Sequence, residues 1–343
     1  MTRLRARDGS YTRPADVPEG SVLSVFRVAP EDEGMRLDVF LRGEMKRTSR
    51  TRAQVIIRSS AFDEAGRRLR PNDRVRAEQR VLLWRPPWDE TPVSRDIRVL
   101  YEDMHLLVVD KPANLPVHPT ARYYRNTLIR LLSDERPDEF LTLCHRIDRE
   151  TSGVLFLARS PEADRLLKKQ LEDREGVEKG YVAITWGVPR GPAGELEFRY
   201  ERRMKLDEGN RLGVKMCLDD GPDSMHSATF FRVEEVRRGP RGEYALVRCD
   251  LETGRQHQIR LHLASLGAPI VGDKLYGPDD ALFARGADGE LTDEDLERLE
   301  LPRHALHASR MSIAHPMTGA PLTVVAPLPA DLAEFWDELS AVP

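Results

Sequence analysis

The chain has 343 residues, of which 40% are hydrophobic and 32% charged, and this length and composition predict two folded domains with a charged surface. No apolar run approaches the roughly 18 residues that a membrane helix needs. The formal net charge of −4 excludes a protein that is basic throughout, as a nonspecific nucleic-acid binder would be.

The charge is unevenly distributed along the chain. Residues 36–85 contain 14 Arg and Lys against 6 Asp and Glu, a net charge of +8, which leaves −12 for the remainder. Residues 279–300 contribute much of the negative charge, with nine acidic against two basic side chains. Such segregation allows one module to bind a polyanion such as RNA or DNA, although two solvated faces would give the same counts.

Four segments follow one another along the chain. Residues 1–32 are polar and basic and are expected to form a flexible leader, because they contain no apolar signal-peptide core. Residues 33–84 are expected to form a small α/β module, residues 85–96 a Pro-rich linker and residues 97–343 a larger domain.

The small module is predicted to begin with two helices. Leu37, Phe40 and Leu41 have the i, i+3, i+4 spacing of one helix face, and Ser49 is placed to cap a second helix whose apolar residues repeat that spacing. Short strands near residue 75 and at residues 81–83 complete the predicted module.

The larger domain is predicted to be α+β. Its strand-like apolar runs outnumber the helical patterns and follow one another in groups. This order favours a mixed, largely antiparallel sheet with flanking helices over a doubly wound parallel sheet. Residues 304–322 are expected to form a strand, a turn and a strand that close the sheet, and no glycine-rich motif indicates a nucleotide cofactor.

A dense polar loop at residues 145–151 comes directly before an apolar strand at residues 154–157. Loops held by a rigid strand are frequent sites of chemistry. Asp148 lies in this loop between Arg146 and Arg149. A surface salt bridge would explain the pattern, and so would a carboxylate that the arginines keep ionised for use as a nucleophile or base.

The stretch 251–262 predicts a helix with several polar side chains. Arg260 has apolar neighbours on both sides, and a buried arginine needs a partner carboxylate. His257 and His262 are five residues apart and do not share a helix face, so no zinc site is predicted.

Tyr181 lies on a predicted alternating strand. It is either a half-buried strand tyrosine or an aromatic platform for a base, whose phenol could also act as an acid or base.

The three cysteines are odd in number, widely spaced and without a CxxC pair. This usage predicts a reduced, cytoplasmic protein without disulfides.

Several of these stretches together resemble a known family. "HRIDRETSGVLFLARS", residues 145–160, resembles the central motif of the RluA-type pseudouridine synthases, and four further stretches resemble the family's other blocks in the same order. They are residues 110–119, 178–187, 251–277 and 306–319. The resemblance spans roughly residues 97–335, and residues 36–59 are similar to the alpha-L RNA-binding domain, named after ribosomal small-subunit protein four.

The resemblance implies roles for individual residues. Asp148 would be the catalytic aspartate, Tyr181 would pack against the target uracil and assist removal of its C5 proton, and Arg260 would keep Asp148 ionised. Arg146 would enter the base stack that the target uridine leaves. The other substrate-binding residues would be His145, Thr151, Arg255 and His257. The RNA-binding residues of the module would be Arg36, Ser49, Arg50, Arg52 and Arg58.

The implied function is the isomerisation of uridine to pseudouridine in RNA, without a metal or cofactor, by a cytoplasmic monomer. Large-subunit ribosomal RNA is the expected substrate, and the acidic residues 279–300 are expected to form a loop that points away from the RNA. Three alternatives remain: a transfer-RNA pseudouridine synthase, a non-catalytic ribosome-assembly factor, and a glycosidase or base-excision enzyme that would use Glu150 as its second acid.

Overall fold

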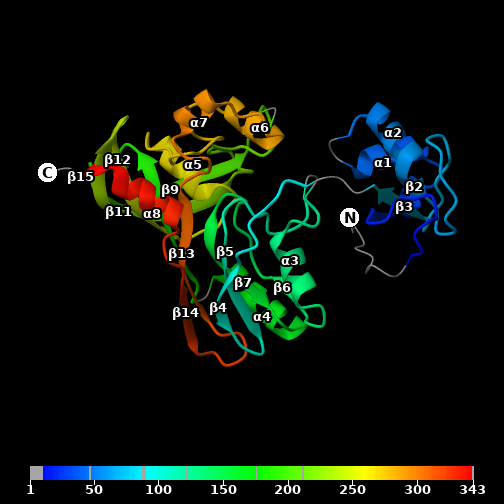
Figure 1. The fold of residues 1–343 in the computed structure, drawn as a ribbon, viewed down its shortest axis with the longest axis horizontal. Helices are drawn as coiled ribbons and strands as arrows, with labels where there is room; N and C mark the ends of the chain where they lie inside the picture. Colours follow the sequence, from blue (N-terminus) through cyan, green and yellow to red (C-terminus); the bar gives the residue numbers. More distant parts are fainter. Residues whose placement is uncertain are drawn as a thin grey trace. The chain divides into compact units, whose positions relative to one another are not determined.

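The computed structural model describes residues 11–45, 48–86, 90–120, 123–174, 176–210 and 212–341. The chain divides into two compact units, Met1–Glu90 and Thr91–Pro343 (Figure 1). The division falls inside the expected linker, residues 85–96. Residues 1–10 of the expected leader and residues 87–89 of that linker lie outside the described residues.

The first unit packs two helices against a three-stranded sheet. The sheet has the order β1-β3-β2, and its elements are β1 (Val22–Arg27), β2 (Ala61–Phe62), β3 (Arg80–Arg85), α1 (Leu37–Glu44) and α2 (Arg50–Ser60). Ser49 caps α2 as predicted, because its side chain accepts a hydrogen bond of 3.2 Å from the backbone N–H of Arg52. Leu37, Leu41 and Ile57 are buried in the core between the helices and the sheet.

The prediction of a flexible leader over residues 1–32 is wrong for its second half. Val22–Arg27 form β1, which pairs antiparallel with β3 along its whole length. Val25 and Phe26 are buried there. The apolar run "VLSVF" therefore belongs to the core of the unit, although the polar, Pro- and Gly-containing residues on either side of it suggested a leader.

The second unit contains one mixed sheet of twelve strands among the described residues. The main path has the order β10-β9-β11-β12-β8-β13-β7-β5-β4, with β14 paired to β13, β15 to β11 and β6 to β7. The strands are β4 (Arg98–Glu102), β5 (Leu106–Lys111), β6 (Thr142–Leu143), β7 (Ser152–Ala158), β8 (Glu178–Trp186), β9 (Glu197–Leu206), β10 (Met216–Leu218), β11 (Met225–Gly239), β12 (Gly242–Leu251), β13 (Leu306–Ala314), β14 (Pro321–Val325) and β15 (Ser340–Ala341). Of these pairs only β7 with β13 is parallel, so the predicted α+β class is confirmed.

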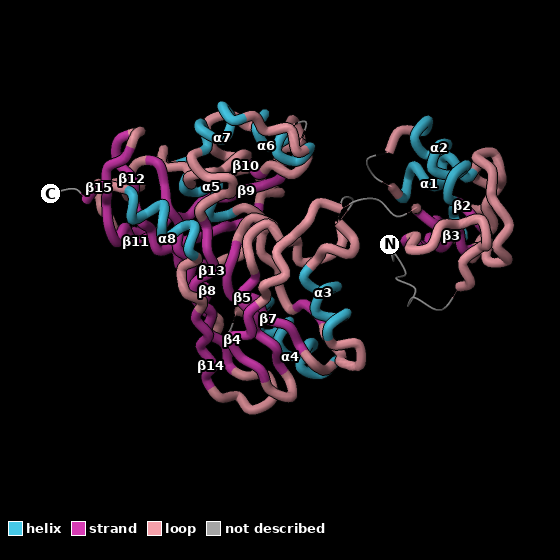
Figure 2. The backbone as a smooth tube through the Cα atoms, viewed as in Figure 1, coloured by secondary structure: helices cyan, strands magenta, loops and turns pink. Residues whose placement is uncertain are grey.

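Six α-helices flank this sheet in the described residues (Figure 2). They are α3 (Leu128–Glu135), α4 (Pro161–Asp173), α5 (Gln258–Ser265), α6 (Ala281–Asp288), α7 (Asp293–Leu299) and α8 (Ala330–Glu338). All seven residues of β7 are buried, because Phe156 and its alternate neighbours pack toward α4 while Leu155 and Leu157 pack toward α3. A strand that is covered on both faces gives a rigid support to the loop before it.

The strand at the centre of the sheet comes from the C-terminal part of the chain. β13 lies between β7 and β8, with Ala308 opposite Gly153 on one side and His307 opposite Val182 on the other. The prediction that residues 304–322 close the sheet is therefore wrong, since β13 joins its two halves. An apolar alternation identifies a strand but does not give its place in the sheet.

The acidic segment 279–300 is not the expected loop. It forms α6 and α7, and a capping box between Thr292 and Asp295 begins α7. Arg285 of α6 binds the Asp295 carboxylate with two hydrogen bonds of 2.7 and 2.8 Å. Several of the acidic side chains thus lie at the N-terminus of α7, where carboxylates are favourable.

Within the part of the chain that the structure describes, no helix is both long and apolar enough to cross a membrane.

Candidate active site

The loop that carries Asp148 is fixed from two directions. It connects β6 to the fully buried β7. The Nζ atom of Lys111, at the end of β5, donates to the carbonyl of Arg149 at 3.0 Å and to the carbonyls of Pro112 and Leu115. Arg303 donates to the carbonyl of Glu150 at 3.3 Å. The backbone on the C-terminal side of Asp148 is therefore held by the buried side chains of Lys111 and Arg303.

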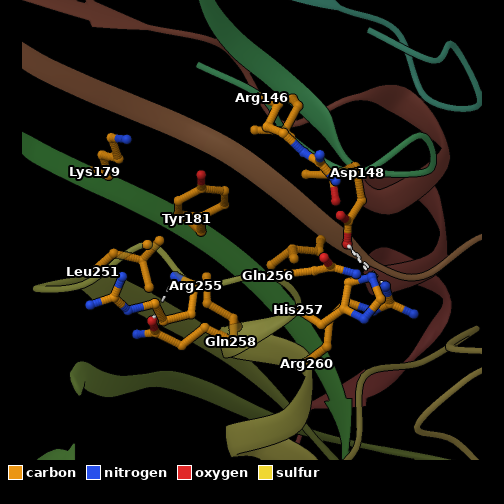
Figure 3. A pocket seen from close by; sticks show the side chains of 15 residues that line it. Arg146, Asp148, Lys179, Tyr181, Leu251, Arg255, Gln256, His257, Gln258 and Arg260 are labelled. Atoms are coloured by element: carbon orange, nitrogen blue, oxygen red, sulfur yellow. Dashed lines mark hydrogen bonds and ion pairs between the residues drawn. The ribbon is translucent and has the colours of Figure 1, made fainter. Parts of the chain in front are cut away.

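Arg260 of α5 is the partner of Asp148. Its NH1 group donates to Oδ2 of Asp148 at 2.9 Å (Figure 3). The rest of the guanidinium binds Asp273 through two hydrogen bonds of 2.7 and 2.8 Å. Asp273 is fully buried and also accepts the backbone N–H groups of Leu275 and Tyr276. The planar arginine thus holds a fixed orientation between two carboxylates.

These contacts keep Asp148 ionised. Burial alone would raise its pKa, but the charges of His257 and Arg260 outweigh burial and lower the pKa to about 2. Burial lowers the pKa of His257 itself to about 4, so this ring is charged only in the acid range where Asp148 titrates. Near neutral pH the ring is uncharged and Arg260 supplies the positive charge. The result is a carboxylate that faces a pocket and stays charged at every physiological pH.

His257 forms the wall of the site next to Asp148. It is the N-cap of α5, with a left-handed φ of 58°, a conformation that is uncommon outside glycine. Its Nε2 atom lies 3.9 Å from Oδ2 of Asp148, and its Nδ1 atom lies 3.2 Å from the hydroxyl of Tyr276. The ring is therefore held by Tyr276 while its other nitrogen faces the carboxylate.

Tyr181 of β8 and Asp148 line the same pocket, which Figure 3 shows with Lys179 two residues earlier on the same strand. Burial raises the pKa of Tyr181, and the negative charge of Asp148 raises it further. The phenol therefore remains protonated and can donate a hydrogen bond. Burial also lowers the pKa of Lys179, to about 8.

The pocket has a volume of about 320 Å³, within the range of small-ligand sites. Its lining includes six of the residues expected to bind or convert the substrate besides Tyr181. They are Arg146, Asp148, Thr151, Arg255, His257 and Arg260. Thr151 is almost fully buried, and its hydroxyl forms a 2.8 Å hydrogen bond with Nε2 of His304.

His145 does not line this pocket. Its Nε2 atom accepts the backbone N–H of Phe156 at 3.1 Å, and its ring lies against the ring of Phe156. Burial keeps its pKa well below the ordinary histidine value. The side chain thus supports the loop from the side of β7, although its position in the motif suggested contact with the substrate.

Sequence reasoning missed two buried carboxylates. Asp273 lies in "VGDKLYG", which reads as a polar turn, and no spacing links it to Arg260. Asp38, in the first unit, is fully buried and accepts hydrogen bonds from Arg36, Arg50 and Gln54 at 2.7 to 3.1 Å. Its partners lie two residues before it and 12 and 16 residues after it, so no helical spacing links them in the sequence.

The expected RNA-binding residues of the first unit therefore differ in their surroundings. Arg36 and Arg50 are both tied to Asp38, and Ser49 is used as a helix cap. Arg52 and Arg58 are exposed on α2.

Comparison with known proteins identifies the family. Residues 105–265 match the model of the RNA pseudouridylate synthase family. The chain is 35% identical to ribosomal large subunit pseudouridine synthase D of Xanthomonas campestris over 94% of each chain. It is 31% identical to ribosomal large subunit pseudouridine synthase C of Salmonella typhimurium, over 89% of this chain and 93% of that protein.

A solved structure supports the same assignment. Human RNA pseudouridylate synthase domain containing 4 has a TM-score of 0.53 and 25% identity, and the match covers 72% of this chain and 95% of that chain. Sequence and fold comparisons thus agree, and the chain belongs to the RNA pseudouridylate synthase family, in its RluA-type group, whose reaction is the isomerisation of uridine to pseudouridine in RNA.

Proposed function

We propose that this chain converts uridine to pseudouridine in large-subunit ribosomal RNA and that Asp148 is the residue that acts on the ribose. Two relatives named as ribosomal large-subunit enzymes align over almost their whole length. The mitochondrial tRNA pseudouridine(32) synthase of Saccharomyces cerevisiae is 39% identical, but the match covers 56% of this chain and 39% of that protein. Transfer RNA is therefore the second candidate substrate.

The observation that carries the proposal is the Asp148–Arg260–Asp273 arrangement. The reaction breaks the bond between C1′ and N1 of uridine and forms a bond between C1′ and C5, while C5 loses a proton and N1 gains one. It needs an ionised carboxylate beside the ribose, either to attack C1′ or to take the 2′ proton. Arg260 keeps Asp148 in that state, and Asp273 keeps Arg260 in place.

The roles of Tyr181 and Arg146 follow from the protonation of the first and the exposure of the second. Tyr181 offers an aromatic face and a protonated hydroxyl to the detached uracil, which has to stay in the pocket while it rotates. Arg146 is exposed at the pocket and is placed to replace the extruded base in its stack.

Glu150 is a poor candidate for the second acid of a glycosidase. Burial would raise its pKa, but Lys274, His304 and Arg149 outweigh burial, and the net pKa is lowered. Both carboxylate oxygens of Glu150 lie 3.0 Å from Nζ of Lys274. A general acid has to be protonated, so this environment disfavours the glycosidase alternative.

We also propose that the first unit, as an alpha-L-like module, increases affinity for RNA, and that the enzyme acts as a cytoplasmic monomer. The exposed Arg52 and Arg58 support the first point. The free cysteines Cys144, Cys217 and Cys249 are what a reducing compartment favours.

The test is tritium release from RNA labelled at C5 of uracil. Large-subunit ribosomal RNA and a transfer-RNA pool are offered separately to the wild type, to Asp148→Asn and to Asp337→Asn, an exposed carboxylate on α8 that serves as the matched control. We expect release from ribosomal RNA with the wild type and the control and none with Asp148→Asn, which should still bind RNA in a filter assay.

Each other outcome has a definite meaning. Release from transfer RNA alone would move the substrate to the second candidate. Release that survives in Asp148→Asn would contradict the role of this carboxylate. Binding without release from either RNA would favour the assembly-factor alternative.

A further inference from the structure

We infer that a second recess, which adjoins the catalytic pocket, binds the nucleobase of a nucleotide next to the target uridine. The inference rests on the proposed function, because it assumes an RNA whose target ribose lies at Asp148. The recess has a volume of about 310 Å³ and shares Asp148, His257 and Arg260 with the first pocket. Of the remaining residues that line the recess, Arg146 is the single one that the sequence predicted to contact the substrate.

The walls that are specific to this recess come from α6 and from the loop before β10. Phe283 and Gly286 of α6 line it together with Val214. Phe283 is half-buried and packs against a cluster around Leu275 and Tyr276, so its ring is held by the core while part of it remains accessible. An aromatic face at the edge of an RNA-modifying site is a stacking surface for an extruded base.

The floor of the recess is polar, but its charges are already neutralised. The ammonium of Lys274 has three donors, and they bind both oxygens of Glu150 at 3.0 Å and the carbonyl of Pro302 at 2.6 Å. Because Lys274 has no donor left for a phosphate, the floor suits a neutral group. A nucleobase is neutral, whereas the phosphates on either side of it are not.

The cations that can meet those phosphates lie at the sides of the recess. Arg146 is exposed, and Arg149 is partly exposed. Arg149 is oriented by hydrogen bonds of 3.1 Å to the hydroxyl of Tyr123 and 3.2 Å to Glu150. A base stacked on Phe283 would thus have guanidinium groups beside it, which is the combination that single-stranded RNA sites use.

Gly286 keeps the recess open and α6 close to its floor. A Cβ atom at this position would lie 2.8 Å from Cδ and 3.3 Å from Cε of Lys274. A larger side chain would therefore have to displace Lys274 from Glu150. The close approach of the helix to the buried ion pair gives the recess its depth.

The experiment compares RNAs that carry the target uridine and lack one neighbouring base. Single-turnover rates and KM are measured on a stem–loop around the modified position, intact or with an abasic nucleotide at either flank. The proteins are the wild type, Phe283→Leu, which keeps the apolar packing but removes the aromatic plane, and Phe283→Ala. Leu296→Ala, an exposed leucine of α7, is the control. Circular dichroism and the melting temperature establish that each variant is folded.

We expect Phe283→Leu and Phe283→Ala to raise KM by about tenfold on the intact RNA, as loss of one base–aromatic stack does. One abasic flank should raise KM of the wild type by a similar factor and should add nothing further in the Phe283 variants. The control should match the wild type on every RNA.

Two results would overturn the inference. One is a KM for Phe283→Leu and Phe283→Ala that equals the wild-type value on the intact RNA. The other is an increase in KM from the Phe283 substitutions that multiplies with the increase from an abasic nucleotide at either flank. Independent increases in KM would mean that Phe283 touches neither flanking base. A wild type without activity on any RNA would instead reject the proposed function, and the inference with it.

Discussion

Arg260 donates to two carboxylates at once, and only Asp148 lines the pocket. The second carboxylate, Asp273, is fully buried and fixes the guanidinium from behind. We therefore predict that Asp273→Asn lowers kcat by about 100-fold, the effect of misplacing a catalytic group by about 1 Å, and leaves KM for RNA nearly unchanged. Tritium release over a range of RNA concentrations measures both constants.

Asp279→Asn is the matched control for this prediction. Asp279 lies six residues after Asp273 in the chain, but its side chain is partly exposed and lies 3.9 Å from Arg298. The control should keep the wild-type kcat. If Asp273→Asn also kept it, Arg260 would not need its second partner.

At the scale of single residues, the sequence predicted the pairing of Asp148 with Arg260. It did not predict which other side chains contact either residue. An arginine among apolar residues demands a carboxylate, and the resemblance to the family named the partner. Asp273 was missed because its contact with Arg260 forms only when the turn after α5 folds back against that helix. His145 shows the opposite case, since a polar residue beside the catalytic one supports the backbone of β7.

Among the elements, the contact between β7 and β13 leaves no room for a side chain at Gly153. Gly153 has a φ of +111°, and a Cβ atom there would lie 2.2 Å from the carbonyl oxygen of Ala308. We predict that Gly153→Ala lowers the free energy of unfolding by more than about 3 kcal/mol, since strain and a backbone collision add. Urea unfolding followed by circular dichroism measures this value.

Gly319→Ala separates the collision from the strain. Gly319 also has a positive φ, +71°, but nothing lies within 4 Å of the position of its Cβ atom. This control should lose only about 1 kcal/mol. Equal losses in the two variants would show that the contact with Ala308 relaxes at little cost.

In the first unit, the packing of α1 against α2 depends on the buried carboxylate of Asp38. The hydrogen bonds of Arg36, Gln54 and Arg50 outweigh burial and keep the pKa of Asp38 well below its usual range. We predict that Asp38→Asn weakens these charge-assisted bonds and destabilises the helix pair by about 2 kcal/mol. Hydrogen exchange of residues 36–60, read by mass spectrometry, should become faster.

The control for this prediction is Asp63→Asn. Asp63 also binds an arginine, Arg67, but its side chain is partly exposed. Exchange over residues 36–60 should stay at the wild-type rate in this variant. A wild-type rate in Asp38→Asn would mean that the buried carboxylate is not needed for the packing of the two helices.

Single helices and strands were predicted from the sequence more completely than the order of the strands in the sheet. The cap at Ser49 and the apolar spacing of α1 are local signals, and both appear in the structure. The place of β13 between β7 and β8 depends on residues that are more than 100 positions apart, so no local pattern could supply it. The helices α6 and α7 were hidden by their acidic composition.

For the whole molecule, buried neutral histidines set the dependence of stability on pH. Burial lowers the pKa of four of them to about 3 or 4; they are His257, His262, His304 and His307. The unfolded chain binds these protons near pH 6.5, so unfolding takes up protons between that pH and about 4. The contribution of these histidines to stability is therefore full above pH 6.5 and falls as the pH is lowered, by about 1.4 kcal/mol per pH unit for each histidine.

Urea unfolding midpoints at pH 7.5, 6.5 and 5.5 check this prediction. His262→Gln should have a shallower dependence than the wild type, because His262 lies between the hydroxyls of Ser227 and Thr229 and no longer titrates in the variant. Midpoints that stay constant over this range would contradict the prediction.

The central position of β13 also has a consequence for synthesis of the chain. Asp148 belongs to the half of the sheet that contains β7, and Arg260 belongs to the half that contains β8 and β12. Among the described strands, β13 alone hydrogen-bonds to both β7 and β8. Its residues, Leu306–Ala314, follow those of β7, β8 and β12 in chain order. A nascent chain therefore holds the carboxylate and its guanidinium on two unjoined subassemblies until β13 has been synthesised.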